Sequence, residues 1–308
     1  MGSTVSSSYR GRFAPSPTGP LHFGSVLAAL GSYLEARSRG GQWLVRMEDV
    51  DEPRCSPSAA DQILRDLEAL GFTWDGEVMV QSRRKQRYGA VLEQLKHDDL
   101  VYPCACSRKD LAAMPAGIDG SPRYPGTCRA GLGAGQTARA WRLRVDDDPV
   151  IFEDGVQGRC SQRLATDVGD FVLLRADGYF AYQLAVVVDD ADQGITHVVR
   201  GADLLDSTPR QIFLQRCLGF PVPDYVHLPV AVNAAGEKLS KQTLAPAVDA
   251  TRPLVPLLAA WQFLGQPAPQ PGEITRLAEF WPWAIAHWQL DRVPQQRQLL
   301  PLSLDNAP

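Results

Sequence analysis

Long apolar runs are missing from this sequence of 308 residues. None approaches the roughly 20 residues that a membrane-spanning helix needs, so we expect no membrane partner. Basic residues are not in excess either, because 31 Lys and Arg face 35 Asp and Glu for a formal net charge of −4. Any nucleic-acid partner must then be held by a local basic patch. Residues 1–8 are mostly small and polar, which predicts a flexible tail over residues 1–9 and not a signal peptide.

A disulfide framework is not indicated by the cysteines. They fall into a cluster, Cys104, Cys106 and Cys128, and a scattered set, Cys55, Cys160 and Cys217. Without an export signal, this pattern favours a metal site plus packed thiols, in a reducing, cytoplasmic compartment. Three thiolates leave a tetrahedral zinc ion one ligand short, so the spacing alone favours zinc and ordinary buried thiols equally.

Strand and helix patterns alternate along most of the chain, which predicts an α/β fold with a parallel sheet. The expected strands are residues 10–14, 43–47, 196–200 and 227–232, and the expected helices are 23–39, 58–70, 83–96 and 208–218. Between residues 101 and 180 the pattern changes to cysteines, glycines and short strands, which indicates an inserted subdomain. The region 251–308 is helical in pattern and rich in Trp, and we expect it to form a small helical subdomain.

Two segments have the residue types that bind polyphosphate. The first runs from Arg12 to Ser25, leaving a strand, turning on Pro and Gly, and entering a helix at His22. A helix N-terminus attracts phosphate, and Gly24 leaves room for a base or ribose. The second is Lys238-Leu239-Ser240-Lys241-Gln242, whose lysines can neutralise charge on leaving pyrophosphate. Taken singly, the first segment can be an ordinary turn and the second a solvated loop.

Together these segments resemble the HIGH and KMSKS signatures of class I aminoacyl-tRNA synthetases. The run Arg-Phe-Ala-Pro-Ser-Pro-Thr-Gly at 12–19 is similar to the opening of the glutamyl-tRNA synthetase branch, as are the blocks at 46–51, 182–190 and 199–205. The resemblance covers residues 10 to about 245. The His-Phe-Gly-Ser form of the first motif, the Gln that ends the lysine loop and the short stretch after Lys241 resemble the short paralogues of that branch, the glutamyl-Q tRNA(Asp) synthetases, which lack the anticodon-binding domain.

The resemblance implies a Rossmann-like catalytic domain in two halves, 10–100 and 181–250, around a zinc-bearing acceptor-binding insertion at 101–180. It also implies sites for ATP, with its Mg²⁺, and for L-glutamate. His22, Lys238 and Lys241 would be catalytic, and the ATP contacts would be His22, Gly24, Ser25 and Lys241. The glutamate contacts would be Arg12, Phe13, Ala14, Pro15, Ser16, Glu48, Tyr182 and Arg200.

The chemistry of these side chains agrees with such a pocket. A guanidinium fork suits a carboxylate, so Arg12 and Arg200 are candidates for the carboxylate of glutamate, and Glu48 is a candidate for its ammonium group. Surface ion pairs are the commoner role of such residues. Their positions at strand ends, where open α/β sheets bind ligands, favour the binding interpretation.

For the metal, the resemblance supplies Tyr124 as a fourth ligand beside Cys104, Cys106 and Cys128. His97 or water stays open as an alternative, and the site is expected to be structural.

The implied reaction is tRNA-independent formation of glutamyl-adenylate, followed by transfer of glutamate to queuosine in the anticodon of tRNA(Asp), by a monomer. The basic residues Arg83, Arg84, Lys85 and Arg87 can meet RNA phosphates or form a solvated helix start. Two other functions stay open: a truncated glutamyl-tRNA synthetase that charges a tRNA 3′ end, and a non-catalytic zinc-bearing RNA-binding module.

Overall fold

Two groups of strands, parallel except for one antiparallel hairpin, meet in the centre of the molecule. The computed structural model describes residues 9–233, 235, 236, 238 and 248–300. One group has the order β1-β2-β3: β1 (Arg10–Phe13), β2 (Gln42–Met47) and β3 (Met79–Val80). The other has the order β7-β6-β10-β9: β7 (Gly158–Arg163), β6 (Pro149–Asp154), β10 (Asp224–Leu228) and β9 (His197–Gly201). The N–H of Thr196 donates to the carbonyl of Arg10 at 2.9 Å, so β9 lies beside β1.

Helix α1 (Phe23–Ser38) connects β1 to its parallel neighbour β2. Leu30 and Leu34 on this helix are completely buried. The helix ends before Gly40, whose φ of +64° is a conformation that glycine adopts without steric cost. Because β1, β2, β9 and β10 are parallel, their carboxyl ends face the same edge, where such sheets bind ligands.

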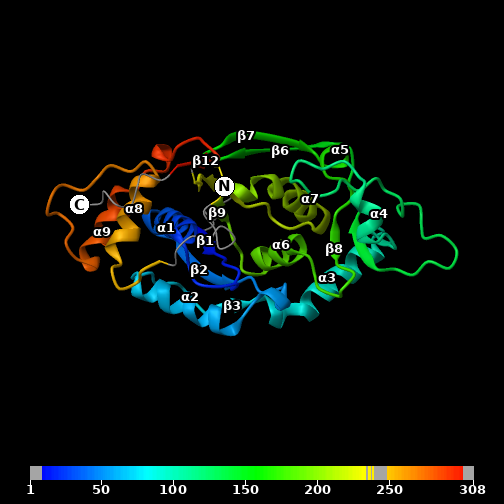
Figure 1. The fold of residues 1–308 in the computed structure, drawn as a ribbon, viewed down its shortest axis with the longest axis horizontal. Coiled ribbons are helices and arrows are strands. Elements are labelled where there is room, and N and C mark those ends of the chain that lie inside the picture. Colours follow the sequence, from blue (N-terminus) through cyan, green and yellow to red (C-terminus); the bar gives the residue numbers. More distant parts are fainter. Residues whose placement is uncertain (1–8, 234, 237, 239–247, 301–308) are drawn as a thin grey trace, which may run out of the picture.

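The other helices cover the strands and extend the molecule at both ends (Figure 1). They are α2 (Pro57–Ala69), α3 (Lys85–His97), α6 (Tyr182–Asp192) and α7 (Thr208–Leu218), with α8 (Leu254–Phe263) and α9 (Leu277–His287) near the C-terminus. The 3₁₀ segments are η1 (Glu52–Arg54), η2 (Gln81–Arg84), η3 (Ala202–Ser207) and η5 (Leu290–Arg292). No helix in the described part of the chain is long and apolar enough to cross a membrane.

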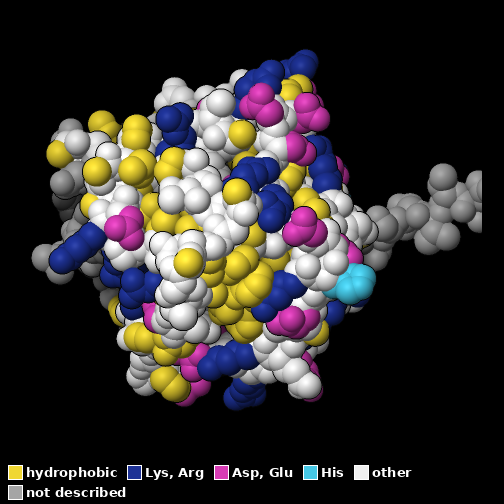
Figure 2. All heavy atoms as spheres, turned by 90° about the vertical axis from the view of Figure 1, so that its right-hand side faces the viewer, with side chains coloured by type: hydrophobic (Ala, Val, Ile, Leu, Met, Phe, Trp, Pro, Cys, Tyr) yellow, Lys and Arg dark blue, Asp and Glu magenta, His cyan; other side chains and the backbone are white. Residues whose placement is uncertain are grey.

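The region 101–180 contains an antiparallel sheet in the order β4-β5-β8: β4 (Val101–Cys104), β5 (Ala140–Leu143) and β8 (Val172–Leu174). Two short helices accompany it, α4 (Arg108–Ala112) and α5 (Leu164–Asp167). The hairpin β6–β7 from the same region instead joins the central strands, because Asp154 pairs with Tyr225 of β10. The face at this end of the molecule carries hydrophobic side chains near its middle, with basic and acidic side chains interspersed around them (Figure 2).

Most expected elements lie within a few residues of their observed bounds, and the helix at 208–218 coincides with α7. The single strand expected at 227–232 is wrong. Strand β10 ends at Leu228, and a separate strand β11 (Val230–Ala231) pairs with β12 (Gln298–Leu299). Pro229 stands at the break, and it has no N–H to donate to a continuous ladder.

The tryptophans near the C-terminus pack in the same hydrophobic cluster as α1. Trp261 and Trp288 are buried there, and the indole N–H of Trp288 donates to the Glu35 carboxylate of α1 at 2.7 Å. The indole N–H of Trp281 donates to the carbonyl of Leu70 at 3.2 Å. Helices α8 and α9 therefore share one core with the first strands of the central sheet.

Candidate functional site

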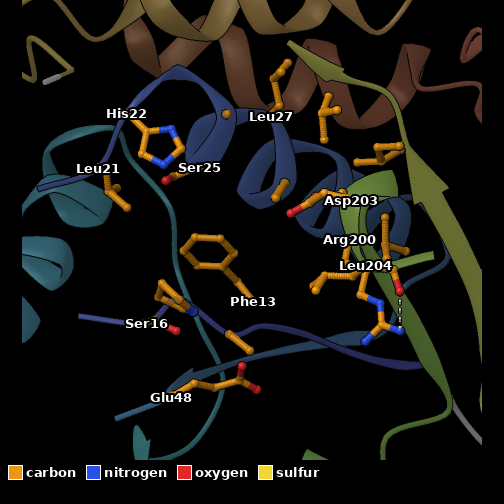
Figure 3. A pocket seen from close by; sticks show the side chains of 18 of the residues that line it. Phe13, Ser16, Leu21, His22, Ser25, Leu27, Glu48, Arg200, Asp203 and Leu204 are labelled. Atoms are coloured by element: carbon orange, nitrogen blue, oxygen red, sulfur yellow. Dashed lines mark hydrogen bonds between the residues drawn. The ribbon is translucent and has the colours of Figure 1, made fainter. Parts of the chain in front are cut away.

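A cavity of about 430 Å³ opens at the carboxyl ends of the central strands. It is lined by every described residue that the sequence analysis assigned to ATP or glutamate: Arg12, Phe13, Ala14, Pro15, Ser16, His22, Gly24, Ser25, Glu48, Tyr182, Arg200 and Lys238. Figure 3 shows His22 and Ser25 on one side of the cavity and Glu48 and Arg200 farther along its wall. Lys241 lies outside the described residues.

The N-terminus of α1 forms one wall of this cavity. His22 has an extended backbone conformation at the N-cap, and its carbonyl accepts from the N–H groups of Ser25 and Val26 at 2.8 and 3.1 Å. The first N–H groups of a helix have no acceptor within the helix and carry its partial positive charge. This wall therefore suits an anion, and Gly24 and Ser25 lie on its first turn.

Buried charged side chains occupy the floor below β1 and β2. Arg12 donates to Asp190 through Nε and Nη2, at 3.1 and 3.4 Å. Arg46 is completely buried and donates to Asp190 at 2.8 Å, to Glu48 at 3.1 Å and to Gln193 at 2.7 Å. The Asp190 carboxylate thus joins two guanidinium groups, one of which also holds Glu48.

Burial and these partners act in opposite directions on the two carboxyl groups. Burial alone would raise the pKa of Asp190, but Arg12 and Arg46 outweigh it and lower that pKa. For Glu48, burial raises the pKa in spite of the attraction of Arg46 and Arg12. A cationic group bound beside Glu48 would favour its charged form.

The sequence analysis gave no role to Arg46 or Asp190. The alternation of side chains along a strand was the available signal, because residues 46 and 48 must face the same side of β2. Asp190 could not be found in this way, since it lies 144 residues from Arg46.

Arg200 lies at the end of β9 on the opposite wall. Its Nη1 is 3.4 Å from the Tyr182 hydroxyl, and its Nη2 donates to Thr208 Oγ1 at 2.7 Å and to the Leu204 carbonyl at 3.5 Å (dashed line in Figure 3). Its Nε donates to Nε2 of His227 at 3.0 Å. Thr208 and His227 are further residues that the sequence analysis missed.

Lys238 is the described member of the lysine loop. Its backbone forms an isolated antiparallel β-bridge with Val232. Its ammonium group pairs with the Asp203 carboxylate at 2.5 Å. Asp203 belongs to η3, directly after β9, and lines the same cavity. This pair holds Lys238 at the strand ends.

The basic residues near the start of α3 make ion pairs within the chain. Arg84 pairs with Asp189 and Asp192, and Arg87 pairs with Asp192 at 2.9 Å. Lys85 pairs with Glu52. Arg84, Lys85 and Arg87 thus have acidic partners within the chain, and Arg83 is exposed.

The three clustered cysteines lie together beside β4. Their Sγ atoms are within 4.8 Å of one another, and Cys106 is 3.6 Å from Cys128. The Tyr124 hydroxyl is 3.5 Å from the sulfur of Cys104 and 3.8 Å from that of Cys106, and it accepts from the N–H of Cys128 at 2.9 Å. Such a group can hold a metal ion. His97 is not part of it, and its exposed ring contacts Asp98.

Arg142 supports the cluster from β5. It donates to the Cys104 sulfur at 3.3 Å, and its guanidinium lies 3.8 Å from the centre of the Tyr124 ring. Burial opposes ionisation of Cys104, but hydrogen bonds from Tyr124 and Arg142 prevail and lower its pKa to about 7. Burial and the neighbouring sulfurs raise the pKa of Cys106 to about 11, and burial raises the pKa of Tyr124. Cys55, Cys160 and Cys217 are half-buried and lie outside this cluster.

Known proteins resemble this chain over nearly its whole length. Residues 8–254 match the family described as tRNA synthetases class I (E and Q), catalytic domain. The chain is 62% identical over 298 residues to a glutamyl-Q tRNA(Asp) synthetase of Dechloromonas aromatica (strain RCB), which covers 96% of this chain and 99% of that relative. It is 60% identical over 299 residues to one from Chromobacterium violaceum, covering 96% of this chain and 98% of that relative.

A solved structure gives the same assignment of the fold. Glutamate-tRNA synthetase from Elizabethkingia anophelis matches with a TM-score of 0.77 at 26% identity, covering 95% of this chain and 68% of that one. The class I synthetase catalytic fold expected from the two motifs is therefore confirmed. The chain belongs to the glutamyl-Q tRNA(Asp) synthetase family of class I tRNA synthetases.

Proposed function

We propose that this protein is a ligase that activates L-glutamate with ATP, without tRNA, and transfers the glutamate to queuosine in the anticodon of tRNA(Asp). The observation that carries the proposal is the single cavity where the N-terminus of α1, Lys238 and the buried groups around Glu48 meet. The names of the relatives support the acceptor, and they favour it over a tRNA 3′ end or a non-catalytic role.

Glutamate would bind between the two charged walls. Arg200, with one nitrogen 3.4 Å from the Tyr182 hydroxyl, is placed to meet a carboxylate, and Arg12 is the second candidate. Glu48 would bind the ammonium group of glutamate. That positive charge would favour the charged form of Glu48, which burial disfavours. Residues 12–16 would supply backbone groups and the Ser16 hydroxyl. Glutamine should be rejected, because its amide leaves a buried guanidinium without a charged partner.

ATP would lie along the start of α1, with His22, Gly24 and Ser25 against it. Lys238 and Lys241 would contact its phosphates. The α-carboxylate of glutamate attacks the α-phosphorus in line, and pyrophosphate leaves. His22, Lys238 and Lys241 stabilise the charge that develops on it. Mg²⁺ that accompanies ATP would share this charge. An acceptor hydroxyl then attacks the mixed anhydride and AMP leaves, so no covalent enzyme intermediate is required.

One structural zinc ion would be held by Cys104, Cys106, Cys128 and Tyr124. Tetrahedral bonds of about 2.3 Å to sulfur place ligand atoms about 3.8 Å apart. The distances of 3.6 Å between Cys106 and Cys128, and of 3.5 and 3.8 Å from Tyr124 to Cys104 and Cys106, fit this requirement. Bound zinc would fasten β4 to the loop around Tyr124 within an acceptor-binding subdomain at 101–180.

These sites assign a role to each region of the chain. The halves at 10–100 and 181–250 would perform adenylation, and the region 251–308 would support α1 through its tryptophans. We further propose that the protein acts as a monomer in the cytoplasm, where tRNA is modified.

Pyrophosphate exchange tests the first step. The protein, ATP and labelled pyrophosphate are incubated with glutamate or glutamine, with and without tRNA. Exchange with glutamate alone is expected, and its absence under every condition would refute the enzyme assignment.

For the second step, labelled glutamate is offered to tRNA(Asp) with or without queuosine, and to queuosine-containing tRNA(Asp) trimmed of its 3′-terminal adenosine. Labelling that needs queuosine and survives trimming is expected, whereas labelling lost on trimming would identify 3′ charging.

A further inference from the structure

Three side chains from adjacent strands form a buried chain that ends at Arg200. Oδ2 of Asp154 on β6 lies 2.6 Å from Nδ1 of His227 on β10, and Nε2 of the same ring lies 3.0 Å from Nε of Arg200 on β9. His227 and Arg200 are direct cross-strand partners. The side chains of Asp154 and His227 are both 0% exposed. Bulk solvent therefore does not reach Asp154 or His227, and their polar atoms bond to neighbouring groups of the chain.

The chemistry of the three groups fixes where the protons lie. A guanidinium only donates hydrogen bonds, so Nε2 of His227 must accept. The ring is then neutral with its proton on Nδ1, and that proton is donated to Asp154. Oδ1 of Asp154 meanwhile accepts from the backbone N–H groups of Val156, Gln157 and His227 at 3.0, 2.9 and 3.1 Å. The carboxylate cannot rotate without losing these contacts.

We infer that Asp154 is a positioning residue that acts through the neutral His227 ring to hold Arg200 toward the glutamate pocket. With Nε bound to His227 and Nη2 bound to Thr208, Arg200 presents Nη1 beside Tyr182, and both residues line the cavity. The inference rests on the proposed function for the role of Arg200. It adds that glutamate affinity depends on a carboxylate two side chains away from Arg200.

Asp154→Asn is the sharpest test, because it keeps the size and shape of the side chain and changes only its charge and its hydrogen-bonding polarity. The amide oxygen can keep the three backbone N–H groups, which places the amide NH₂ where Oδ2 was. That NH₂ donates to Nδ1 of His227, so the ring proton must move to Nε2. There it opposes the N–H of Arg200, and Thr208 Oγ1, 3.0 Å from Nε2, is the acceptor left to it. Losing a hydrogen bond to a charged group predicts a KM for glutamate raised about 10- to 100-fold, with the KM for ATP nearly unchanged.

The position of the ring proton is read independently of activity. Nitrogen chemical shifts of the His227 ring separate a bare nitrogen from a protonated one, and the signals are assigned by their loss in His227→Asn. Wild type should show a bare Nε2, and Asp154→Asn a protonated one. Glu153→Gln, an exposed change on the same strand, is the matched control and should alter neither the ring nor the KM.

His227→Asn supplies the second arm. Its amide still reaches toward Asp154 but offers no acceptor to Arg200, so the KM for glutamate should rise, and adding Asp154→Asn should raise it little further. A protonated Nε2 in wild type overturns the inference, whether or not Asp154→Asn folds. The inference is also overturned if Asp154→Asn carries its ring proton on Nε2 and still has an unchanged KM for glutamate. Full additivity of the two substitutions in their effect on this KM would overturn it as well. Loss of glutamate-dependent exchange in wild type would refute the proposed function instead, and the ring measurement would still stand.

Discussion

Arg46 and Asp190 form an ion pair in the floor of the cavity, with 2.8 Å between Nη2 and Oδ1 and exposed side-chain fractions of only 0% and 6%. The same carboxylate oxygen accepts from Arg12, and the same Arg46 nitrogen donates to Glu48. Because guanidinium and carboxylate groups alternate through this floor, each is oriented before a ligand arrives. An ordered set of charges is what a small zwitterion needs for tight and selective binding.

Asp190→Asn should therefore lower both stability and glutamate affinity. It removes the charge that compensates Arg46 and Arg12, and breaking a buried pair costs about 3–5 kcal/mol of unfolding free energy. Urea unfolding measures the stability loss, and pyrophosphate exchange measures the KM. Asp192→Asn is the control on the same helix, since its pairs with Arg84 and Arg87 are partly exposed and each is worth less than about 1 kcal/mol. Equal losses in the two variants would show that the buried network has no special role.

Lys238→Ala should slow adenylation and leave glutamate binding nearly intact. Lys238 is held beside the cavity by Asp203, and its proposed work is to stabilise charge that appears only as pyrophosphate leaves. Removing one such group lowers kcat by about 100-fold or more. Steady-state exchange rates over a range of glutamate concentrations give kcat and KM separately. Lys109→Ala, an exposed lysine on α4, serves as the control, and a change confined to KM would remove Lys238 from the chemical step.

Lys241→Ala is expected to abolish exchange for the same reason, although this residue lies outside the described part of the chain. Its zinc content and circular dichroism spectrum should match those of wild type, because Lys241 is proposed to act on ATP and is not one of the proposed zinc ligands. Wild-type exchange in this variant would place the catalytic positive charge elsewhere.

Cys128→Ser should remove the metal and keep adenylation. The cluster is left with two thiols, too few for a tetrahedral zinc site, so zinc measured by plasma mass spectrometry should fall from one per chain to nearly none. The melting temperature should fall as well, because a structural metal contributes to folding. Cys217→Ser, at a half-buried thiol outside the cluster, is the control. Full zinc content in Cys128→Ser would rule out this ligand set.

Local patterns in the sequence predicted much of this site, and the reason is visible in α1 and β2. Apolar spacing gave the helix after His22, and the strand before Glu48 was a short apolar run, so both residues could be placed at strand and helix ends. What the sequence could not give is pairing between distant segments. Asp154 and His227 are 73 residues apart, and Arg46 and Asp190 are 144 apart. Neither periodicity nor composition reveals which residues so far apart in the sequence are in contact. The position of the β6–β7 hairpin beside β10 could not be predicted for the same reason, since it depends on the pairing of Asp154 with Tyr225.

His227 should also make the protein sensitive to mild acid. Burial lowers its pKa to about 4, with Arg200 acting in the same direction and Asp154 and Asp203 opposing, whereas an unfolded histidine titrates near about 6.5. Between these values the unfolded chain binds the extra proton, so stability is full above about pH 6.5 and falls as the pH drops to about 4. Over that window the loss amounts to about 3 kcal/mol. Urea unfolding across the range should therefore show a flatter pH dependence in His227→Asn, which has no ring to protonate. Parallel curves for the two proteins would mean that His227 is not the group that titrates on unfolding.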